Sequence, residues 1–519
     1  MKSNDKNVIG VLYIQRDVQT DDVKMALQTS YLGKDVTVTV NREDVTVKGF
    51  QELRGKGFPV MTKKEAECII LDIFDDEENV PLKEVFHNVG WHTINGVPYF
   101  FLKKALCDRN IEDMEYNGCL NLDIKGKLKK SVEFYNENIV NSDGLQAIVA
   151  VSLTSALVGM IAEKDLKFIF HIEGTSTTGK TTSLMLAGSV WGNPKIAPNG
   201  IIKNWNTTDN KLINSVGGNN GIPVGLDELS MSNANITQLT YLLTGGIDKQ
   251  RMNDENTVDN EFRTIFLSTG EIQFKNSNFG GIGVRLIEVK DYNFTETKEK
   301  ADLITEFIQQ NYGIIGFEFA RNLTKYSSDY MKNKIEEYSE KVIKRLKSHA
   351  EKQGIAYSPL FSRLAEKIAT VLVAAQFAKK KLGIQFDIKA IADFLICQTT
   401  VLENGQEQAV VAMEKFMEEY NKNQKKFPVD EKGQNIWGKV TVKNRELTEI
   451  IVLYNQFVQM MKKVGFPDTS SLIKALKEKN FIKCEKDKNY SRRNVGDNKK
   501  AKVIVIDVLA LNGGADDED

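Results

Sequence analysis

The sequence has few cysteines and no excess of charge of either sign. Its 5 cysteines are scattered through 519 residues, and no two of them form a Cys-x-x-Cys pair. This pattern excludes a disulfide framework and a zinc-binding cysteine cluster, and it is typical of a reducing cytoplasm. The formal net charge of -1 excludes a bulk polycation. Any contact with nucleic acid must therefore come from local basic patches.

The sequence also lacks the layout of a signal peptide at its N-terminus, and it holds one long apolar run. That run, residues 145–161, is nearly long enough to span a bilayer, but it contains Gln146, Ser152 and Thr154. It leads directly into an apolar strand and a glycine-rich loop. We therefore expect a buried core helix, no membrane association and a cytoplasmic protein.

The length and composition predict a globular α/β protein of several domains. Hydrophobic residues make up 41% of the chain and charged residues 27%, which is ordinary for such proteins. We expect the following parts: an N-terminal α+β domain (1–115), a polar linker (116–132), a core of strands and helices (133–295), a Lys/Glu-rich helical region (296–425), a C-terminal domain (433–511) and an acidic tail (512–519).

The N-terminal region shows local patterns but no catalytic constellation. Residues 35–50 alternate with period two and predict strands, whereas residues 63–75 predict an amphipathic helix. The Asn95-Gly96 pair predicts the turn of a hairpin. His87 and His92 could form a metal pair, although ordinary structural roles are favoured.

The clearest motif is GTSTTGKTTS, which fits the pattern GxxxxGK[ST] of a phosphate-binding loop. Glycines let the backbone N–H groups point inward at phosphates, and the helix that follows directs its positive end at the same anion. Lys180 is expected to reach the β and γ phosphates of ATP, and Thr181 to bind Mg²⁺. Nucleotide contacts are expected from the whole loop: Gly174, Thr175, Ser176, Thr177, Thr178, Gly179, Lys180, Thr181 and Thr182.

Two later strands carry polar residues at their ends. The apolar run "GIPVGLDELS" ends in Asp227 and Glu228. Asp227 is expected to share the Mg²⁺ ion with Thr181, and Glu228 to polarise the attacking water. The strand "RTIFLSTGE" ends in Ser268 and Thr269, either of which could orient that water or simply cap the strand.

These motifs together resemble the P-loop ATPases of phages and mobile elements that are similar to MCM helicases, among them replicative helicases of staphylococcal cassette chromosome elements. The runs that carry the resemblance are WNTTDNKLINSVGG, YLLTGGIDKQRMN, FRTIFLSTGE and GGIGVRLIEV, together with the P-loop and the acidic pair. The resemblance implies an AAA+ fold with a helical lid at 296–425. It also implies assembly into a ring, expected to be a hexamer, with ATP sites between subunits.

The resemblance further implies arginines that act on a neighbour's ATP. Arg285 stands where the MCM pattern has its arginine finger, although Val284 and Leu286 replace the serine and phenylalanine of that pattern. Arg363, in the helix "SPLFSRLAEKIATVLVAAQFA", corresponds to a second, sensor arginine of the lid.

DNA is the partner that the resemblance implies. A hairpin before the sensor strand projects into the pore of MCM-type rings, and Lys249 and Arg251 lie on one face of the corresponding segment. They are expected to contact phosphates of single-stranded DNA without reading its sequence.

The C-terminal domain offers a second DNA surface. It is expected to begin with helices and to end as helix, strand, basic turn and strand, which is the layout of a winged helix. Arg492 and Arg493 in the wing are the expected contacts with duplex DNA. Further basic residues accompany them: Lys474, Lys477, Lys479, Lys499 and Lys500. A solubilising turn or a protein-binding winged helix are the alternatives.

The function predicted from these features is that of an ATP-dependent DNA helicase for replication of a mobile genetic element. An AAA+ ATPase that remodels proteins or loads another helicase is the alternative. A scaffold that binds ATP without cleaving it would need neither Glu228 nor Arg285. The N-terminal region is expected to bind DNA or to stabilise the ring.

Overall fold

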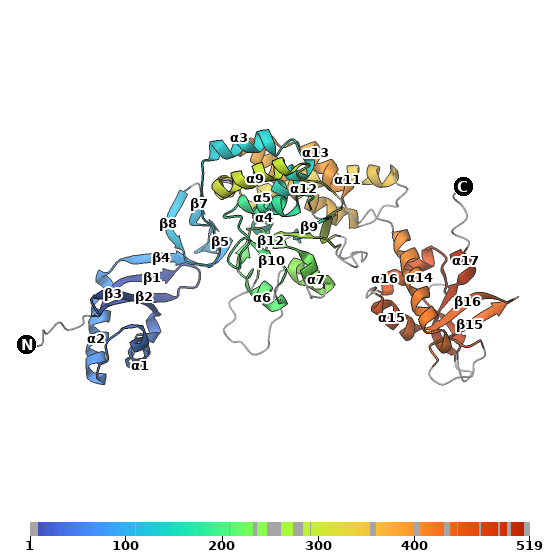
Figure 1. Cartoon of the computed structure of the whole chain (residues 1–519), viewed down its shortest axis with the longest axis horizontal. Helices are drawn as coiled ribbons and strands as arrows, with labels where there is room; N and C mark the ends of the chain where they lie inside the picture. The colour runs from blue at the N-terminus through green and yellow to red at the C-terminus, as the bar shows by residue number, and fades with distance from the viewer. Residues whose placement is uncertain are drawn as a thin grey trace, which may run out of the picture.

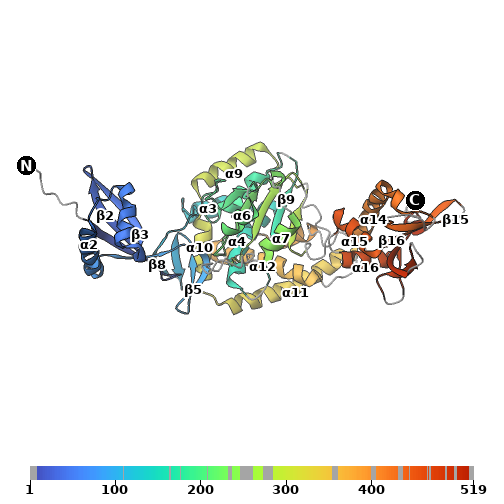
Figure 2. The same ribbon diagram turned by 90° about the horizontal axis from the view of Figure 1, so that it is seen from below.

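The computed structural model describes residues 9–512 except 109, 163–164, 176, 207, 232–235, 246–260, 273–283, 291, 353–359, 399–404, 430–435, 444, 465, 467–468, 486–487 and 496–499. The two views agree that an N-terminal unit, a central body and a C-terminal unit follow one another along the long axis (Figures 1 and 2). The fold is therefore a mixed α/β arrangement of several units, as the composition predicted.

The N-terminal unit is built on one nine-stranded sheet. Its strands follow the order β11-β5-β6-β7-β8-β4-β1-β2-β3. Their bounds are β1 (Gly10–Asp17), β2 (Val23–Tyr31), β3 (Lys34–Asn41), β4 (Leu82–Phe86), β5 (Val89–Ile94), β6 (Val97–Phe101), β7 (Lys104–Cys107), β8 (Asn110–Tyr116) and β11 (Asn219–Asn220). The strand β11 comes from the central body, so the two units share this sheet.

The helices of this unit are α1 (Val47–Glu52) and α2 (Lys63–Asp76). The predicted helix at 63–75 is confirmed, and Thr62 and Glu65 form a capping box at its start. Only the first half of the alternating stretch 35–50 is a strand. The prediction was wrong beyond it, because Thr46 accepts a hydrogen bond from the Gly49 N–H and starts α1 instead.

The hairpin predicted at Asn95-Gly96 is confirmed. Strands β5 and β6 pair antiparallel on either side of it. Asn95 and Gly96 have φ values of 50° and 80°, which is the left-handed backbone that a tight hairpin turn requires.

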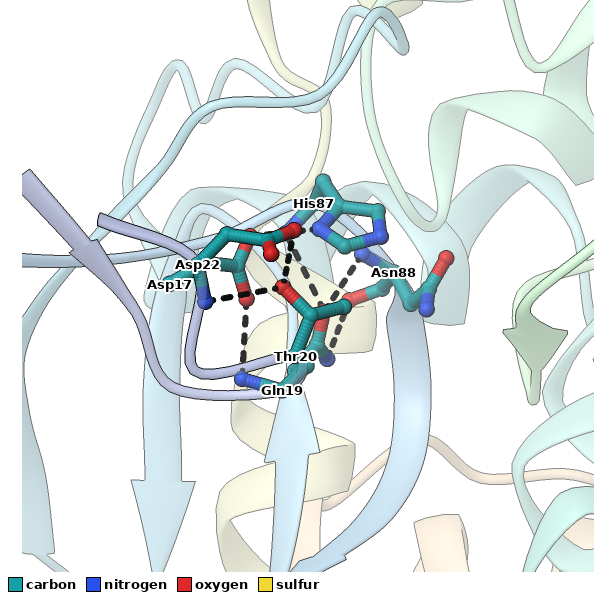
Figure 3. A network of polar contacts seen from close by, with 6 residues as sticks. All are labelled: Asp17, Gln19, Thr20, Asp22, His87 and Asn88. Atoms are coloured by element: carbon teal, nitrogen blue, oxygen red, sulfur yellow. Dashed lines mark hydrogen bonds and ion pairs between the residues drawn. The ribbon is translucent and has the colours of Figure 1, made fainter. Parts of the chain in front are cut away.

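A polar network joins the β1–β2 turn to the connection between β4 and β5 (Figure 3). His87 Nδ1 lies 2.6 Å from Asp17 Oδ2, and this hydrogen bond raises the pKa of His87. Gln19 Oε1 accepts from the backbone N–H groups of His87 and Asn88 at 3.1 and 2.8 Å. His87 is therefore a structural residue of this joint.

His92 is also structural. Its Nε2 lies 3.1 Å from the Val89 carbonyl and 3.0 Å from the Gly218 carbonyl, and burial lowers its pKa. In the part of the chain that the structure describes, no three His, Cys, Asp or Glu residues gather as a metal site would need.

The central body contains a sheet of five parallel strands in the order β10-β12-β13-β9-β14. These are β9 (Ile169–Glu173), β10 (Ile202–Asn204), β12 (Val224–Asp227), β13 (Phe266–Gly270) and β14 (Leu286–Val289). Because all five strands run the same way, the predicted P-loop after β9 and the acidic pair after β12 lie at the same, carboxyl-terminal end of the strands.

Helices cover both faces of this sheet. Phe170 and Ile172 face α4 (Asp143–Met160) and α5 (Lys180–Ser189) in one apolar cluster. Ile169 and Phe266 belong to the cluster on the other face, which includes side chains of α6 (Asp209–Asn214) and α7 (Ile236–Gly245). Successive residues of a strand, such as Ile169 and Phe170, therefore point to helices on opposite faces of the sheet.

Helix α4 is the apolar run that could have been mistaken for a membrane span. It is the one helix among the described residues that is long and apolar enough to cross a bilayer, and 89% of it is buried inside the protein. Ser152 donates to the Ala187 carbonyl at 2.7 Å and ties α4 to α5. The predicted core helix is confirmed.

The helices after the sheet share their apolar core with α4 and α5. They are α9 (Lys298–Gln310), α10 (Ile314–Leu323), α11 (Ser328–Lys352), α12 (Leu360–Leu382) and α13 (Ile388–Cys397), accompanied by α3 (Leu128–Asn138) from earlier in the chain. Within this core α12 and α13 pack against α4, whereas α9 packs against α5.

The C-terminal unit combines helices with a small sheet of order β15-β16-β19-β17, in which β18 also pairs with β19. Its elements are α14 (Gly405–Lys422), β15 (Gly438–Lys443), β16 (Glu446–Leu453), α15 (Tyr454–Lys463), α16 (Thr469–Glu478), β17 (Ile482–Lys483), β18 (Ser491–Asn494), β19 (Lys500–Asp507) and α17 (Val508–Asn512). Helix α14 falls within the expected region 296–425, yet it packs against α15 and α16.

The expected helix is present as α16, but three strands follow it instead of two, because Arg492 and Arg493 of the expected basic turn lie in β18. The expected helical start is wrong, because β15 and β16 form an antiparallel hairpin there. Val440 is buried in this hairpin, and Arg445 at its turn has a φ of 67°.

Candidate ATPase site

The predicted P-loop connects the carboxyl end of β9 to the first turn of α5. Gly179 immediately precedes α5 with a φ of 78°. A Cβ atom at Gly179 would meet Thr295 Oγ1 at 2.5 Å. This position therefore needs glycine for both its backbone and its space. Thr177 adopts a φ of 79° and adds local strain to the loop.

Lys180 is buried beneath this loop, with an exposed fraction of 8%. Its Nζ donates to the carbonyl oxygens of Gly174 and Thr175 at 2.5 and 2.8 Å. Neither partner is a carboxylate, so the positive charge is not neutralised by these contacts. The ammonium therefore lies inside the loop with its charge available to an anion.

Asp227 connects the P-loop helix to the neighbouring strand. Its Oδ1 accepts from the Thr181 hydroxyl at 3.4 Å and from the Thr269 hydroxyl at 2.5 Å. The three residues come from α5, β12 and β13. Strand β13 lies between β9 and β12, which places Thr269 between the loop and the acidic pair.

Glu228 follows in a strained conformation. Its φ of 65° is unusual for a residue with a side chain. Its backbone N–H donates to Thr269 Oγ1 at 3.2 Å, and its carboxylate accepts from the Ser230 hydroxyl. Thr269 thus contacts both acidic residues. Backbone strain of this kind persists where surrounding contacts hold it, which is common at functional sites.

Ser268 points to the opposite face of the sheet. Trp205 Nε1 donates to Ser268 Oγ at 3.0 Å, and His171 Nδ1 lies 2.8 Å from the same oxygen. His171 Nε2 lies 3.1 Å from the Ile272 carbonyl, and burial lowers the pKa of His171 to about 3. A neutral ring that donates from Nε2 and accepts the Ser268 proton satisfies all these contacts.

Sequence reasoning missed His171 and Trp205, and the alternation of β13 is the signal that could have separated Ser268 from Thr269. Adjacent residues of a strand face opposite sides. If Thr269 faces the acidic pair, Ser268 has to face the core.

Arg285 lies at the amino-terminal end of the parallel strands, whereas the P-loop lies at their carboxyl-terminal end. It directly precedes β14, and its carbonyl accepts from the Ile169 N–H at 2.8 Å, where β9 begins. Its guanidinium lies 3.9 Å from Asp165 Oδ2 and 5.1 Å from the centre of the Tyr241 ring. The length of β9, about 15 Å, therefore separates Arg285 from the P-loop of its own chain.

Arg363 is exposed on the first turns of α12. Lys367, one turn later on the same helix, donates to the carbonyls of Asp165 and Lys167, both at 2.8 Å. The amino-terminal part of α12 therefore lies at the same sheet edge as Arg285. The structure brings neither arginine to the P-loop of its own chain.

Four of the predicted residues belong to parts of the chain that the structure does not describe. Ser176 of the loop, Lys249 and Arg251 of the predicted pore hairpin, and Lys499 lie outside the described residues. Of the remaining loop residues, Thr175, Thr177 and Thr181 are exposed and Thr178 and Thr182 are half-buried.

The segment predicted as a wing forms the antiparallel pair of β18 and β19. Arg492 lies directly opposite Lys502, and Asn494 lies opposite Lys500. Arg492 and Arg493 are exposed. Like charges facing each other across a strand pair destabilise the pair, so a polyanion bound there would relieve the repulsion.

Comparison with solved structures identifies this architecture. The chain matches a structure titled "SCCmec type IV Cch - active helicase" with a TM-score of 0.71 and 21% sequence identity, over 97% of this chain and 94% of the other. The chain has the fold of Cch. The resemblance expected from the motifs is therefore confirmed at the level of the fold.

Family models match two parts of the Cch-like chain. Residues 408–512 match the "Cch helix turn helix domain", which begins within α14 and covers the C-terminal unit. Residues 7–263 match a "Domain of unknown function (DUF927)", which spans the N-terminal sheet and much of the central sheet.

Two further comparisons add little. An apo structure of the C-terminal region of NrS-1 covers 95% of this chain and 96% of its own, but at 10% identity and a TM-score of 0.29 it carries no argument. No curated protein matches the sequence.

Proposed function

We propose that this protein is an ATP-dependent DNA helicase that acts as a ring-shaped translocase of the AAA+ type. The observation that carries the proposal is the placement of Asp227 between Thr181 and Thr269, at the sheet edge where the P-loop begins α5. The Cch structure, which has the same fold, is described as an active helicase. Replication of a mobile genetic element is the process that this likeness suggests.

ATP and Mg²⁺ are the proposed cofactors, and the residues present fit them. Lys180 and the loop N–H groups would hold the phosphates, while Thr181 and Asp227 would hold the metal ion. The ion would neutralise charge on the phosphates. The exposed hydroxyl of Thr181 and the acceptor oxygens of Asp227 are the oxygen ligands that Mg²⁺ prefers.

Glu228 is the proposed base for the attacking water. The Ser230 hydroxyl contacts only Oε1 of its carboxylate, so Oε2 can accept from the water, while the Glu228 backbone N–H donates to Thr269. Thr269 is the proposed sensor, because its hydroxyl contacts Asp227 and the Glu228 N–H together. Ser268 is engaged by Trp205 and His171 and is not proposed for this role.

Arg285 and Arg363 are proposed to act on the ATP of a neighbouring subunit. Both lie at the sheet edge away from their own P-loop, so a head-to-tail ring would bring them to the next subunit's site. A hexamer is the assembly we propose for this ring. The helices α9–α13 would supply the lid that carries Arg363.

DNA is proposed to bind at two surfaces. Lys249 and Arg251, which follow α7 in the sequence, would contact single-stranded DNA in the pore. Arg492 and Arg493 of the wing would contact duplex DNA. The excess of positive charge between β18 and β19 supports the second surface.

The testing experiment measures ATP turnover with and without single-stranded DNA. We expect DNA to stimulate the wild type, and Glu228→Gln to lower turnover by about 10²–10⁴-fold. The double variant Lys249→Ala/Arg251→Ala should retain basal turnover but lose the stimulation. Strand displacement on a forked duplex should follow the same pattern.

Turnover that ignores DNA in every variant would contradict the helicase. It would favour an ATPase of the same fold that remodels proteins or loads another helicase. In the assay with single-stranded DNA, Arg492→Ala/Arg493→Ala is the matched control, because it removes two cations from the surface proposed to bind duplex DNA and leaves the pore segment unchanged.

A further inference from the structure

A buried lysine joins α12 to the start of the P-loop strand. Lys367 has an exposed fraction of 2%. Its Nζ donates to the carbonyl oxygens of Asp165 and Lys167, each at 2.8 Å. Burial lowers the pKa of Lys367 to about 8, and the charges of Asp165, Arg285, Lys167 and Glu366 also act on it.

This arrangement is costly for the fold. A buried ammonium that binds only carbonyls loses its hydration without gaining a carboxylate partner. An apolar side chain of similar length would fill the same space on α12 at lower cost. The lysine therefore requires an explanation other than stability.

The segment that Lys367 holds contacts Arg285 in two ways. The Asp165 carboxylate lies 3.9 Å from the Arg285 guanidinium. Two residues after Lys167, the N–H of Ile169 donates to the Arg285 carbonyl at 2.8 Å. The short segment that Lys367 holds therefore contacts both the backbone and the guanidinium of Arg285.

The same segment reaches α7. Lys167 Nζ donates to the carbonyl of Gly245, the last residue of α7, at 3.3 Å. Tyr241 of α7 lies below the Arg285 guanidinium at 5.1 Å. The next residues along the chain are 246–260, which contain Lys249 and Arg251.

We propose that Lys367 is a positioning residue that fixes the segment Asp165–Lys167 and thereby orients Arg285 toward the ATP site of the neighbouring subunit. This inference rests on the proposed function, in which Arg285 acts between subunits. Since Arg363 lies one turn before Lys367 on α12, the same contact sets both arginines relative to the sheet edge. The contact with Gly245 links this edge to the segment proposed to bind DNA.

The test uses the full chain and three variants: Lys367→Met, Arg285→Ala and Lys180→Ala. Turnover is measured for each alone and for equimolar mixtures with Lys180→Ala. A mixed ring places an intact Arg285 edge from the Lys180→Ala subunit beside an intact P-loop from the other variant. Nucleotide affinity and thermal stability are measured on the same samples.

We expect Lys367→Met to lose at least about tenfold in turnover, with nucleotide affinity unchanged and a Tm equal to or above that of the wild type. Mixing with Lys180→Ala should restore turnover, as it should for Arg285→Ala. A residue needed only for folding would give a lower Tm and no restoration by mixing. Lys367→Gln, which keeps an amide donor, should retain part of the activity.

The matched control is Lys379→Met. Lys379 lies on the same helix and its Nζ also donates to a carbonyl, that of Phe386 at 2.9 Å, but it does not contact the Asp165–Lys167 segment. We expect its turnover to stay within about twofold of the wild type.

Two outcomes separate this inference from the proposed function. Wild-type turnover in Lys367→Met, with Arg285→Ala inactive, would overturn the role of Lys367 alone. Wild-type turnover in Arg285→Ala would overturn the action between subunits, and the positioning role would fall with it. A third outcome, loss of nucleotide binding in Lys367→Met, would also overturn the positioning role, because the lysine would then act on the P-loop of its own subunit.

Discussion

At the scale of single residues, Gly179 is the position where the P-loop leaves no room for a side chain. Gly179→Ala would place a Cβ 2.5 Å from Thr295 Oγ1, on a backbone with a φ of 78°. We expect it to destabilise the nucleotide-free protein by about 1–3 kcal/mol. Thermal and denaturant unfolding measure this directly.

Gly174→Ala is the matched control for that substitution. A Cβ at Gly174 would have Thr178 Oγ1 as its nearest neighbour, at 3.3 Å. The stability of the nucleotide-free protein should therefore change by less than about 1 kcal/mol. Equal losses in both variants would contradict the steric explanation.

Thr269 and Ser268 should respond oppositely to removal of their hydroxyl groups. Thr269→Val removes the contact with Asp227, so we expect turnover to fall by about 10–10²-fold with little loss of stability. Ser268→Ala leaves His171 and Trp205 without a shared buried partner, so we expect a loss of about 1–3 kcal/mol in stability.

Steady-state turnover and denaturant unfolding of both variants check this pair of expectations. A drop in turnover confined to Ser268→Ala would reverse the assignment of the sensor. A loss of stability in both variants, without loss of turnover, would remove the sensor role from this strand.

The residues of the site differ in how visible they are in the sequence. The proposed roles of Lys180 and Asp227 follow from motif spacing, because phosphate and Mg²⁺ binding require those residue types. The choice between Ser268 and Thr269 needs the face of the strand. The role proposed for Lys367 could not be predicted from the sequence, because it depends on carbonyls about 200 residues earlier in the chain.

At the scale of elements, the polar network between the β1–β2 turn and the β4–β5 connection should be detectable in the titration of the histidines. The hydrogen bond to Asp17 raises the pKa of His87, whereas burial lowers that of His92. In NMR titrations, we expect His87 to titrate above about 6.5 and His92 below it. His171 should stay neutral down to about pH 4, because its pKa is about 3.

The sign of the His87 shift gives a pH dependence of stability. A raised folded-state pKa means that the folded chain holds the proton more tightly than the unfolded chain. This contribution is complete below about pH 6.5 and is lost as the pH rises through the folded value. His87→Gln should flatten the stability of the N-terminal unit between about pH 6 and 8. An unchanged slope in that variant would place the titrating group elsewhere.

The wing should contribute to duplex DNA affinity through charge. We expect Arg492→Ala/Arg493→Ala to weaken duplex binding at all sequences alike and to reduce the log–log salt slope by about 2. Lys463→Ala is the control, because Lys463 is neutralised by Glu419 at 2.5 Å in the same unit. Fluorescence anisotropy across a salt series measures both. Equal losses in the two variants would indicate general charge instead of a wing contact.

Elements were predictable where the local pattern and the tertiary setting agree. Helix α4 is apolar all round, and it is buried all round. The failures have local causes. Thr46 caps α1 inside an alternating stretch, and β15 lies where the sequence had suggested helix. There the antiparallel pairing with β16 makes the segment a strand, and this pairing is a tertiary contact that local sequence patterns do not show.

At the scale of the whole molecule, the proposed function makes hydrolysis depend on assembly, because the P-loop and Arg285 lie at opposite ends of the parallel strands. We expect turnover per subunit to fall by at least about tenfold on dilution into the monomeric range, while nucleotide affinity persists. Turnover and light scattering over the same concentration series check this. Full activity in monomeric fractions would contradict the arrangement between subunits.

The arrangement of units was only partly predictable from the sequence. The order of domains follows from composition and motifs, but the pairing of β11 with β5 does not. A strand of two residues, Asn219–Asn220, has no periodicity to detect. Its role depends on where the central body places it.

That short strand limits which segments such proteins can exchange with their relatives in evolution. A Cβ at either Gly90 or Gly159 would approach the Asn220 carbonyl to 2.1 Å, so β5, α4 and the Asn219–Asn220 segment fit one another backbone to backbone. The DUF927 match runs across all three, from residue 7 to 263. Recombination that exchanged the N-terminal sheet alone between relatives would have to match this three-way fit. Exchange of the whole segment as a cassette would preserve it.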